Sequence, residues 1–396
     1  MKVVSTERMP IKMWLDDIED GALQQAKNLA NLPFAFKHIA IMPDSHEGYG
    51  MPIGGVLATK GVIIPNAVGV DIGCGMCAVK TSLTELETET LKKILEEIRK
   101  VIPVGFEHHK LDQDESLMPK INDVEFAEKF YPICNREYTK ALKQIGTLGG
   151  GNHFIEIQKG SDGFIWIMIH SGSRNFGLQI ANYYNDIAKK LNAKWFSGID
   201  PKQDLAFLPL DSDEGKSYMR EMQYAVDFAL ANRKLMMEMI KDIFLENTWS
   251  YFKKEVAFDE MINIAHNYAR MENHFGQNVM IHRKGATLAD ENTIGIIPGS
   301  QGTKSYIVKG KGNKDSFNSC SHGAGRKMGR KDAERSLDLA DEIKKLDDQG
   351  ILHGIRGKHD LDEAPGAYKD IDVVMDNQKD LVEILVELQP LAVIKG

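Results

Sequence analysis

Apolar, strand-like runs that end in a histidine are the feature that most limits how this chain can fold. The run 164–169 (Phe-Ile-Trp-Ile-Met-Ile) is followed by His170, and the run Ile262–Ala265 is followed by His266. A short apolar run bounded by glycine or polar residues is typical of a buried strand. A histidine at the end of such a strand can point into the space where sheet edges form a site, although each one alone also fits a hydrogen-bonded structural role. The two runs therefore predict buried sheet whose strand ends carry polar chemistry.

Helical patterns alternate with further strand-like runs along the chain. The segment 88–102 carries an apolar stripe from Leu91 to Ile102 behind a proposed Thr88 cap, and 217–245 predicts a second, longer helix. Additional strands are expected at 62–64, 279–281, 294–297 and 306–308. No linker rich in Pro, Gly and Ser divides these segments, so mixed α and β elements around one core are expected.

Composition limits the class of protein. Hydrophobic residues make up 42% and charged residues 27% of the chain, which is typical of a globular protein with ample core. We expect no secretory signal and no membrane span, because no apolar stretch is long enough. Four cysteines in 396 residues do not form a disulfide framework, which favours a reduced, cytoplasmic protein.

Charge is distributed unevenly. The net charge is −8, yet the window 304–331 holds eight Lys or Arg and a single acid, Asp315. Within this window, Ser319 to Arg326 reads Ser-Cys-Ser-His-Gly-Ala-Gly-Arg. Small residues allow a backbone to approach a phosphate closely, an arginine can clamp its oxygens, and a histidine nitrogen can attack phosphorus. The octamer therefore predicts phosphate chemistry at His322, with a glycine-rich turn that caps a helix as the alternative.

Five candidate metal ligands stand in four short blocks, each with an apolar approach followed by glycine or polar residues. They are Asp71, Cys74, His153, His170 and His266. This mixed set of oxygen, sulfur and nitrogen donors suits divalent first-row metals, and it suffices for two ions if the thiolate bridges them. Cys74 and Cys77 also form a Cys-x-x-Cys, which elsewhere signals a redox dithiol. No second such motif accompanies it, so the metal site is the favoured interpretation.

Taken together, these blocks resemble the RtcB family of RNA ligases. The matching motifs run in the family's order: Asp71-Ile-Gly-Cys-Gly-Met76, Gly151-Asn-His-Phe154, His170-Ser-Gly-Ser-Arg174, His266-Asn-Tyr268, Arg283-Lys-Gly-Ala286, Pro298-Gly-Ser300, His322-Gly-Ala-Gly-Arg326, Ala364-Pro-Gly-Ala-Tyr-Lys-Asp370 and Ile394-Lys-Gly396. The resemblance covers essentially the whole chain. It implies an α+β fold in which a single large mixed α/β domain, residues 1–396, places mixed sheets around a central metal and nucleotide cleft.

The resemblance also implies a role for each site residue. His322 would be the histidine that becomes guanylylated, Cys74 a thiolate shared by two Mn²⁺ ions, and Asp44 an acid that supports the metal ligands. Arg174 and Arg326 are expected to bind RNA or phosphate. The expected GTP pocket consists of Asn152, His153, Phe154, Ile155, Glu156, His266, Asn267, Pro298, Gly299, Ser300, Gln301, Ser305, His322, Gly323, Ala324, Gly325, Tyr368 and Lys395.

Within this pocket Glu156 would pair with the guanine edge, which selects GTP over ATP. Gln301 departs from the family's pattern, in which Pro-Gly-Ser is followed by Met. Nucleotide motifs of other kinds do not fit the chain. The tripeptide Gly215-Lys216-Ser217 looks like the end of a P-loop, but Leu210 occupies the position of that motif's first glycine.

The implied activity is GTP- and Mn²⁺-dependent ligation of an RNA 3′-phosphate or 2′,3′-cyclic phosphate end to a 5′-hydroxyl end, in RNA repair or tRNA splicing. Two alternatives remain at this point. A dinuclear phosphoesterase would need the metal ligands but neither His322 nor a guanine pocket. A non-catalytic RNA-binding factor would need the basic window alone.

Overall fold

The computed structural model describes residues 1–121, 131–252 and 256–396, and two sheets form its centre. The six-stranded sheet has the order β1 (Lys2–Val4), β2 (Ile11–Met13), β3 (Ala35–His46), β4 (Ile53–Thr59), β12 (Gln277–Lys284) and β11 (Asn267–His274). The seven-stranded sheet has the order β10 (Ile262–Ala265), β6 (Gly75–Lys80), β8 (Ile165–Ser171), β7 (Phe154–Gly160), β17 (Val382–Lys395), β15 (Ser305–Gly310) and β14 (Ile294–Ile297). β2 and β3 pair in parallel, whereas the seven-stranded sheet is built from antiparallel pairs.

Each face of the seven-stranded sheet has a different partner. On β7, Ile155 and Ile157 join a buried cluster with α2 (Thr88–Val101) and α6 (Asp213–Phe252). Phe154 lies on the opposite face, in a cluster with α8 (Leu339–Asp347) and the segment that follows it. Because successive side chains of a strand alternate between faces, Glu156 shares the face of Phe154. The local alternation of β7 therefore decides which residues can line a site above this sheet.

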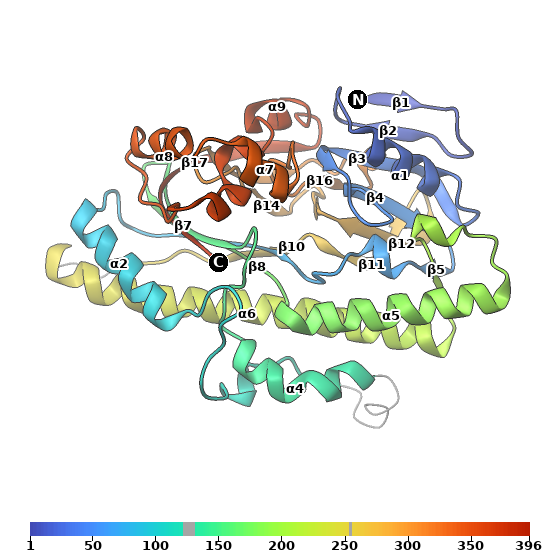
Figure 1. Cartoon of the computed structure of the whole chain (residues 1–396), viewed down its shortest axis with the longest axis horizontal. Helices are drawn as coiled ribbons and strands as arrows, with labels where there is room; N and C mark the ends of the chain where they lie inside the picture. Colours follow the sequence, from blue (N-terminus) through green and yellow to red (C-terminus); the bar gives the residue numbers. More distant parts are fainter. Residues whose placement is uncertain (122–130, 253–255) are drawn as a thin grey trace.

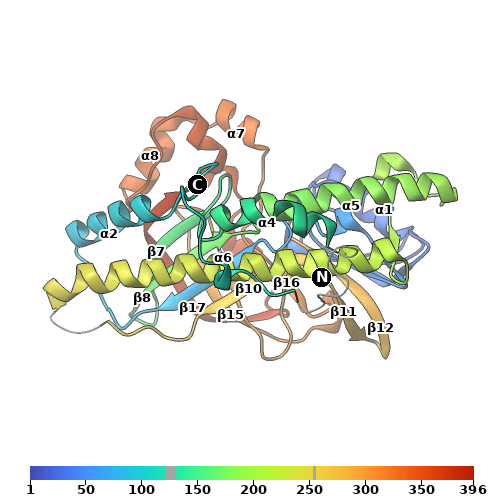
Figure 2. The ribbon, with the colours of Figure 1, turned by 90° about the horizontal axis from the view of Figure 1, so that it is seen from below.

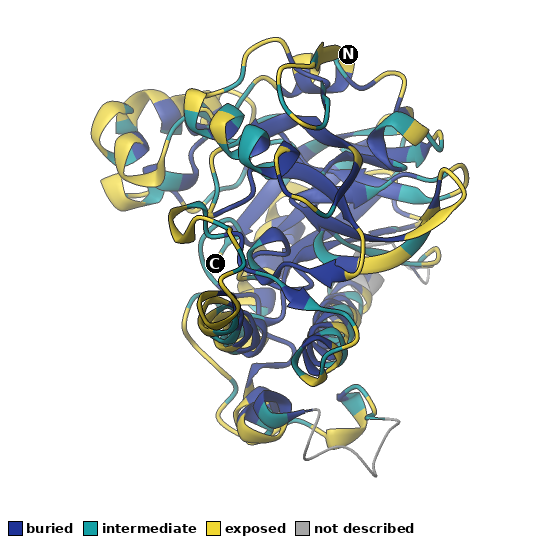
Figure 3. Ribbon diagram, turned by 90° about the vertical axis from the view of Figure 1, so that its right-hand side faces the viewer, coloured by how far each residue is buried: buried dark blue, intermediate teal, exposed yellow. Residues whose placement is uncertain are grey.

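The long helices cover one side of the sheets. Figure 1 shows α5 (Arg174–Trp195) and α6 running beneath them, with α4 (Pro132–Gln144) further below. The view from below in Figure 2 shows how far α6 extends along the molecule. Met222 and Met236 of α6 are buried in the core, as expected for methionines that fill gaps between helices and sheet. Figure 3 shows that burial is concentrated in the strands, while the outer faces of the helices are exposed.

The six-stranded sheet is also covered on both faces. α1 (Asp20–Ala30) packs on one face through Ala26, Leu29 and Ala30. On the other face lie α9 (Ile371–Asp376) and a short strand pair, β13 (Ala286–Leu288) with β16 (Ser319–Ser321). A second short pair joins β5 (Val62–Ile63) and β9 (Leu208–Pro209), and α7 (Arg330–Ser336) precedes α8.

His266 lies where the chain passes from one sheet to the other. β10 belongs to the seven-stranded sheet, β11 belongs to the six-stranded sheet, and His266 is the residue between them. The backbone of His266 forms hydrogen bonds with two other segments. His266 N donates to Cys74 O at 2.8 Å, and Ala286 N donates to His266 O at 3.2 Å. The strand ends of both sheets therefore meet at this residue.

The predicted α+β class is confirmed, and each predicted helix and strand corresponds to an observed element. The longer predicted helix extends further, as Asp213–Phe252. Thr88 was wrong as a cap, because Glu87 precedes the first helical residue and no side-chain cap bond forms there. Among the described residues, none of the helices has the length and apolarity that crossing a membrane requires.

Candidate active site

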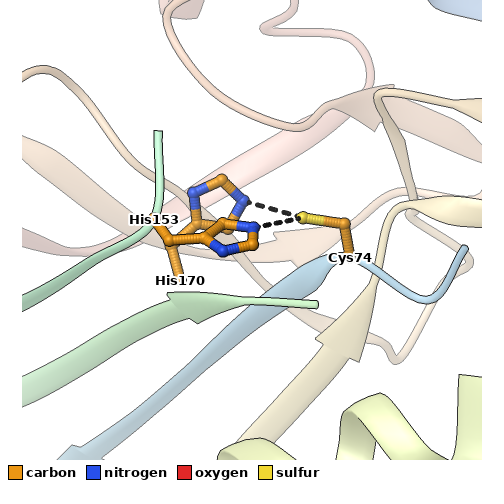
Figure 4. Close-up of side chains that lie close together, drawn as sticks. All are labelled: Cys74, His153 and His170. Carbon is orange, nitrogen blue, oxygen red and sulfur yellow. Dashed lines mark hydrogen bonds between the residues drawn. The ribbon is translucent and has the colours of Figure 1, made fainter. Parts of the chain in front are cut away.

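A thiol and two imidazoles converge at the ends of three adjacent strands. Cys74 Sγ lies 3.4 Å from His153 Nε2 and 3.3 Å from His170 Nε2 (Figure 4). Cys74 precedes β6, His153 precedes β7, and His170 lies near the end of β8. All three side chains are buried, and their potential ligand atoms lie within 4.8 Å of one another. The sequence prediction placed these three residues in one metal site, and the structure brings them together.

The hydrogen bonds of the two imidazoles determine which nitrogen faces the thiol. His153 Nδ1 donates to Leu148 O and His170 Nδ1 donates to Asn152 O, each at 3.0 Å. A carbonyl can only accept, so Nδ1 of each ring carries a proton, and loss of any proton on Nε2 leaves a lone pair that points toward Cys74. Asp71 Oδ2 adds a carboxylate 3.1 Å from His153 Nε2. Lone pairs and an anion that converge in this way fit a bound divalent cation.

The charge states of the cluster follow from burial and from neighbouring groups. Burial, followed by the nearby Asp71 carboxylate, raises the pKa of the Cys74 thiol well above its ordinary value. Although burial opposes ionisation, the hydrogen bond and charge of His153 hold the pKa of Asp71 below its usual range. Burial depresses the pKa of His170 strongly, which keeps that ring neutral. A cation in the cluster would favour the thiolate, because metal binding displaces the thiol proton.

His266 extends the cluster toward His322. Its ring centroid lies 5.2 Å from that of His170 and 4.7 Å from that of His322. His266 is 3% exposed, and its Nδ1 is one of the buried side-chain polar atoms of the described residues that have no hydrogen-bond partner. Burial lowers its pKa well below the ordinary value, so the ring is neutral and can coordinate. An orphaned nitrogen at this point fits the predicted role of His266 as a ligand.

Two features hold the ligand loops in place. A Cβ added at Gly172 would lie 2.3 Å from Asp71 Oδ1, so only glycine allows the carboxylate to come this close to the strand end. Arg233 of α6 is fully buried and donates to Gly73 O at 3.0 Å and to Ser171 O at 2.8 Å. Arg233 was not predicted, because an arginine in a helical pattern gives no signal of its tertiary partners.

His322 follows β16 and is held by Asp44 of β3. Asp44 Oδ2 accepts from His322 Nδ1 at 2.7 Å, from His322 N at 3.0 Å and from Gly323 N at 3.3 Å. Asp44 is 0% exposed. A Cβ at Gly325, where φ is +75°, would lie 2.2 Å from Asp44 O, so this glycine permits the close approach. Asp44 was expected to support the metal ligands, and in the structure its carboxylate contacts His322.

A cavity of about 890 Å³ opens beside His322 and His170. Most of the predicted nucleotide pocket lines it: Asn152, Phe154, Glu156, Pro298, Gly299, Ser300, Gln301, His322, Gly323, Ala324, Gly325, Tyr368 and Lys395. Arg326 and Arg330 also line it, and so does Glu363, which the sequence analysis did not single out. The cavity therefore joins the histidine and the metal cluster in a single site.

Glu156 and Lys395 lie on neighbouring strands, on the face of the seven-stranded sheet that bears the cavity. Glu156 is 2% exposed, and Gln158 Nε2 donates to its Oε2 at 2.7 Å. Burial raises the pKa of Glu156 to about 8 against the opposing charge of Lys395. Lys395 pairs in register with Phe154, and its Nζ lies 5.7 Å from the centroid of that ring. A buried acid and a half-buried base thus face the same cavity.

Several predicted residues lie behind the cavity wall. The Ile155 side chain is in the core against α2 and α6. Ser305 Oγ accepts from Gln158 Nε2 and from Gly299 N, both at 3.2 Å, so it braces the wall. Asn267 donates to Asp71 O at 3.1 Å and accepts from Gly285 N at 2.7 Å.

The two arginines predicted to bind phosphate have partners within the protein. Arg174 donates to Thr147 Oγ1 at 2.9 Å and to Gly105 O at 2.8 Å, and it does not line the cavity. Arg326 lines the cavity, but its guanidinium donates to Met328 O at 3.1 Å, Asp362 O at 2.6 Å and Glu363 Oε1 at 3.0 Å. The positive charge that the sequence assigns to Arg326 is therefore paired within the pocket.

The alternative chemistries have less support from the geometry. Cys77 lies in the core cluster between sheet and α2, its thiol is free, and burial raises its pKa to about 12. Cys74 is also free and faces the imidazoles. Lys284, a conceivable nucleophile, donates to Tyr49 O at 2.6 Å and to Asn66 O at 3.1 Å, and it does not line the cavity.

Fold and site together define an α+β protein with a Cys/His cluster that can hold a metal. Beside this cluster lies a cavity whose wall includes His322, which the Asp44 carboxylate holds in place. A family model described as tRNA-splicing ligase RtcB matches residues 25–396. The RNA-splicing ligase RtcB of Escherichia coli K12 is 41% identical over 100% of this chain and 99% of its own length. The tRNA-splicing ligases RtcB of Thermococcus kodakarensis and Methanococcus maripaludis are 31% and 33% identical, each over 98% of this chain and 95% of its own length. The chain belongs to the RtcB family, and it is an RNA ligase.

Proposed function

We propose that the protein is a GTP- and Mn²⁺-dependent ligase that joins an RNA 3′-phosphate or 2′,3′-cyclic phosphate end to a 5′-hydroxyl end. It would act in RNA repair or tRNA splicing. We also propose that residues 1–396 act as one catalytic domain, because the residues of the site range from Asp44 to Lys395 along the chain. The observation that carries the proposal is the setting of His322, held by Asp44 at the wall of a nucleotide-sized cavity.

The hydrogen bond to Asp44 determines which nitrogen of His322 reacts. A carboxylate only accepts, so Nδ1 carries the proton and Nε2 carries the lone pair. In the proposed first step Nε2 attacks the α-phosphorus of GTP. A P–N bond forms, the P–O bond to pyrophosphate breaks, and GMP remains on the imidazole. Asp44 holds the ring in the reactive tautomer and stabilises the positive charge that the ring gains on attack.

Asp71, Cys74, His153, His170 and His266 are the residues that would hold the metal. Cations bound there would neutralise charge on the phosphate oxygens and favour in-line displacement. The ring of His266 lies 4.7 Å from that of His322, so the ligands and the proposed nucleophile act on the same phosphate region. The metal cluster and the cavity thus support a reaction at phosphorus.

GMP would then pass from His322 to the RNA 3′-phosphate. The 5′-hydroxyl of the second end attacks that activated phosphate, a new phosphodiester bond forms, and GMP leaves. A 2′,3′-cyclic phosphate must first be opened by water. The guanine base would lie against Glu156 and Lys395, since a carboxylate accepts from N1–H and the N2 amine while an ammonium donates to O6.

Incubation of the protein with α-labelled GTP and Mn²⁺ tests the proposal. Acid-labile label that remains on the protein, and transfers to an RNA bearing a 3′-phosphate, is the expected result. A phosphoesterase would instead open the cyclic phosphate to a monoester, or release phosphate from a 3′-phosphate end, and leave the protein unlabelled. An RNA-binding factor without activity would retain RNA without either reaction, and both of these outcomes would overturn the proposal.

A further inference from the structure

Glu363 is a buried carboxylate in the wall of the cavity. It is the last residue of a 3-10 helix, η6 (Lys358–Glu363), and it is 3% exposed. A carboxylate at this depth is costly unless it is paired. Its partners therefore indicate what this residue contributes.

Each carboxylate oxygen of Glu363 has two partners that line the cavity. Oε1 lies 3.0 Å from Arg326 Nη1 and 3.2 Å from Arg330 Nε. Oε2 accepts from the hydroxyl of Tyr368 and lies 3.7 Å from Lys395 Nζ. Although burial favours the neutral acid, the charges of Lys395 and Arg326 hold the pKa of Glu363 below its usual value. The carboxylate is thus ionised at neutral pH and connects side chains from three segments of the chain.

The backbone of Glu363 makes a further link that depends on an unusual residue. Gln301 Nε2 donates to Glu363 O at 2.9 Å, and Gln301 also lines the cavity. The methionine expected at this position has no N–H to donate. The Pro298–Gln301 turn is therefore tied to Glu363 by a hydrogen bond that methionine could not make.

Lys395 lies between two buried carboxylates, Glu363 and Glu156. Burial lowers the pKa of the Lys395 ammonium, and the charges of Glu363 and Glu156 offset part of this effect. Glu156 was expected to contact the nucleotide base, whereas Glu363 is bound to protein groups on both of its oxygens. Glu363 is consequently the fixed anchor of this trio.

We propose that Glu363 is a positioning residue for base selection, which holds Lys395 beside Glu156 so that the pair recognises the six-keto edge of guanine. The proposal rests on the proposed function, because it requires that this cavity bind GTP. An ammonium fixed in this place donates to O6 of guanine, whereas the 6-amino group of adenine would face a cation with no acceptor. Loss of the anchor should therefore reduce discrimination between the two purines more than it reduces chemistry at His322.

Glu363→Gln is the principal variant, because glutamine keeps the size of the side chain and removes its charge. Glu342→Gln is a matched control: Glu342 is 1% exposed and accepts from Gly366 N at 3.0 Å, but it does not line the cavity. The primary readout is the ratio of initial labelling rates with GTP and with ATP. Unfolded protein lowers both rates equally, so it cancels from the ratio. The dissociation constant of GTP is measured in parallel by calorimetry.

We expect Glu363→Gln to lower the GTP-to-ATP ratio and to weaken GTP binding, each by about tenfold, as for a lost charged hydrogen bond. Glu342→Gln should leave both values within about twofold, since surroundings away from the ligand contribute little to its binding. Lys395→Met, at the penultimate residue, should lower the ratio by a similar factor. Glu363→Gln added to Lys395→Met should then have little further effect, because the two residues act as one unit.

The role of Glu363 is overturned if Glu363→Gln leaves the GTP-to-ATP ratio unchanged, or if Glu342→Gln lowers that ratio equally. The proposed function still stands in that case, provided that GTP labels the unmodified protein. If Glu363→Gln does not fold, an unchanged ratio in Lys395→Met overturns the role by itself. Absence of both GTP binding and GTP labelling in the unmodified protein overturns the proposed function and the role of Glu363 together.

Discussion

Binding of GTP should release a proton from Glu156. Burial raises the pKa of this carboxyl to about 8, so most of the free protein carries the neutral acid at pH 7. The donors N1–H and N2–H₂ of guanine favour the carboxylate, because only the ionised form accepts with both oxygens. GTP should therefore bind more tightly as the pH rises through about 8, and Glu156→Gln should abolish this component of the pH dependence.

The size of this pH effect on GTP affinity follows from the fraction of the protein in which Glu156 is ionised. With a pKa near 8, about one tenth of the Glu156 side chains are ionised at pH 7. GTP should then bind about tenfold more weakly at pH 7 than at pH 9, and binding at pH 7 should release about 0.9 proton.

The raised pKa of Glu156 also affects the stability of the fold. Between the ordinary value of 4.5 and about 8 the unfolded chain loses this proton while the folded chain keeps it, so the free energy of unfolding falls as pH rises.

Titration calorimetry measures the proton directly, because the observed heat depends on the ionisation enthalpy of the buffer. His322→Ala protein prevents covalent transfer during the titration, and two buffers at pH 7 are sufficient. Lys395, the charged neighbour of Glu156, and the phosphates of GTP are present in both the parent and Glu156→Gln proteins, so their protons cancel in the difference. Equal proton release from the two proteins, or affinity that does not change between pH 7 and pH 9, would refute the assignment of Glu156 to the guanine edge.

Three further substitutions test the remaining parts of the site. His322→Ala should abolish GMP labelling and ligation while the metal content stays unchanged by mass spectrometry; persistent labelling would place the nucleophile elsewhere. Asp44→Asn should slow single-turnover labelling about a hundredfold, as two weakened charged hydrogen bonds of about 1.5 kcal/mol each would do, and an unchanged rate would contradict the proposed tautomer. Cys74→Ser should lower the metal content far more than Cys77→Ser does, because the imidazoles contact Cys74, and equal losses would speak against the cluster.

The strands that the sequence predicts are short, mostly apolar runs without proline. Ile262–Ala265 and Ile294–Ile297 were predicted with their observed bounds. β3 and β17 were not predicted, although they are the longest strands among the described residues. Each contains a proline at or next to an irregularity in its register, Pro43 between Ile41 and His46 and Pro390 before Ala392. Proline is tolerated in a strand at such points, but in the sequence alone it interrupts the pattern.

The site could be predicted where glycine-rich blocks surround a reactive residue, and not where partners come from distant segments. The candidate metal ligands and His322 stand in such blocks. The contact between His322 and Asp44 joins residues 278 positions apart, and the surroundings of Glu363 give no comparable local signal. Arg326 illustrates a further limit, since the sequence shows a guanidinium beside small residues but not that Glu363 and two carbonyls already bind it. Charge is visible in a sequence, whereas its pairing is a property of the fold.

Most candidate metal ligands lie at strand ends of the seven-stranded sheet, whereas Asp44 of the six-stranded sheet holds the proposed nucleophile, so the junction between these sheets sets their separation. His170 lies near the end of β8 in the seven-stranded sheet, and Asp44 belongs to β3 of the six-stranded sheet. Asn267 forms hydrogen bonds on both sides of this junction. It donates to Asp71 O, before β6 of the seven-stranded sheet, and accepts from Gly285 N, after β12 of the six-stranded sheet. A displacement of about 1 Å is enough to impair a reaction that needs in-line geometry. We therefore expect Asn267 to serve the chemistry by holding this distance.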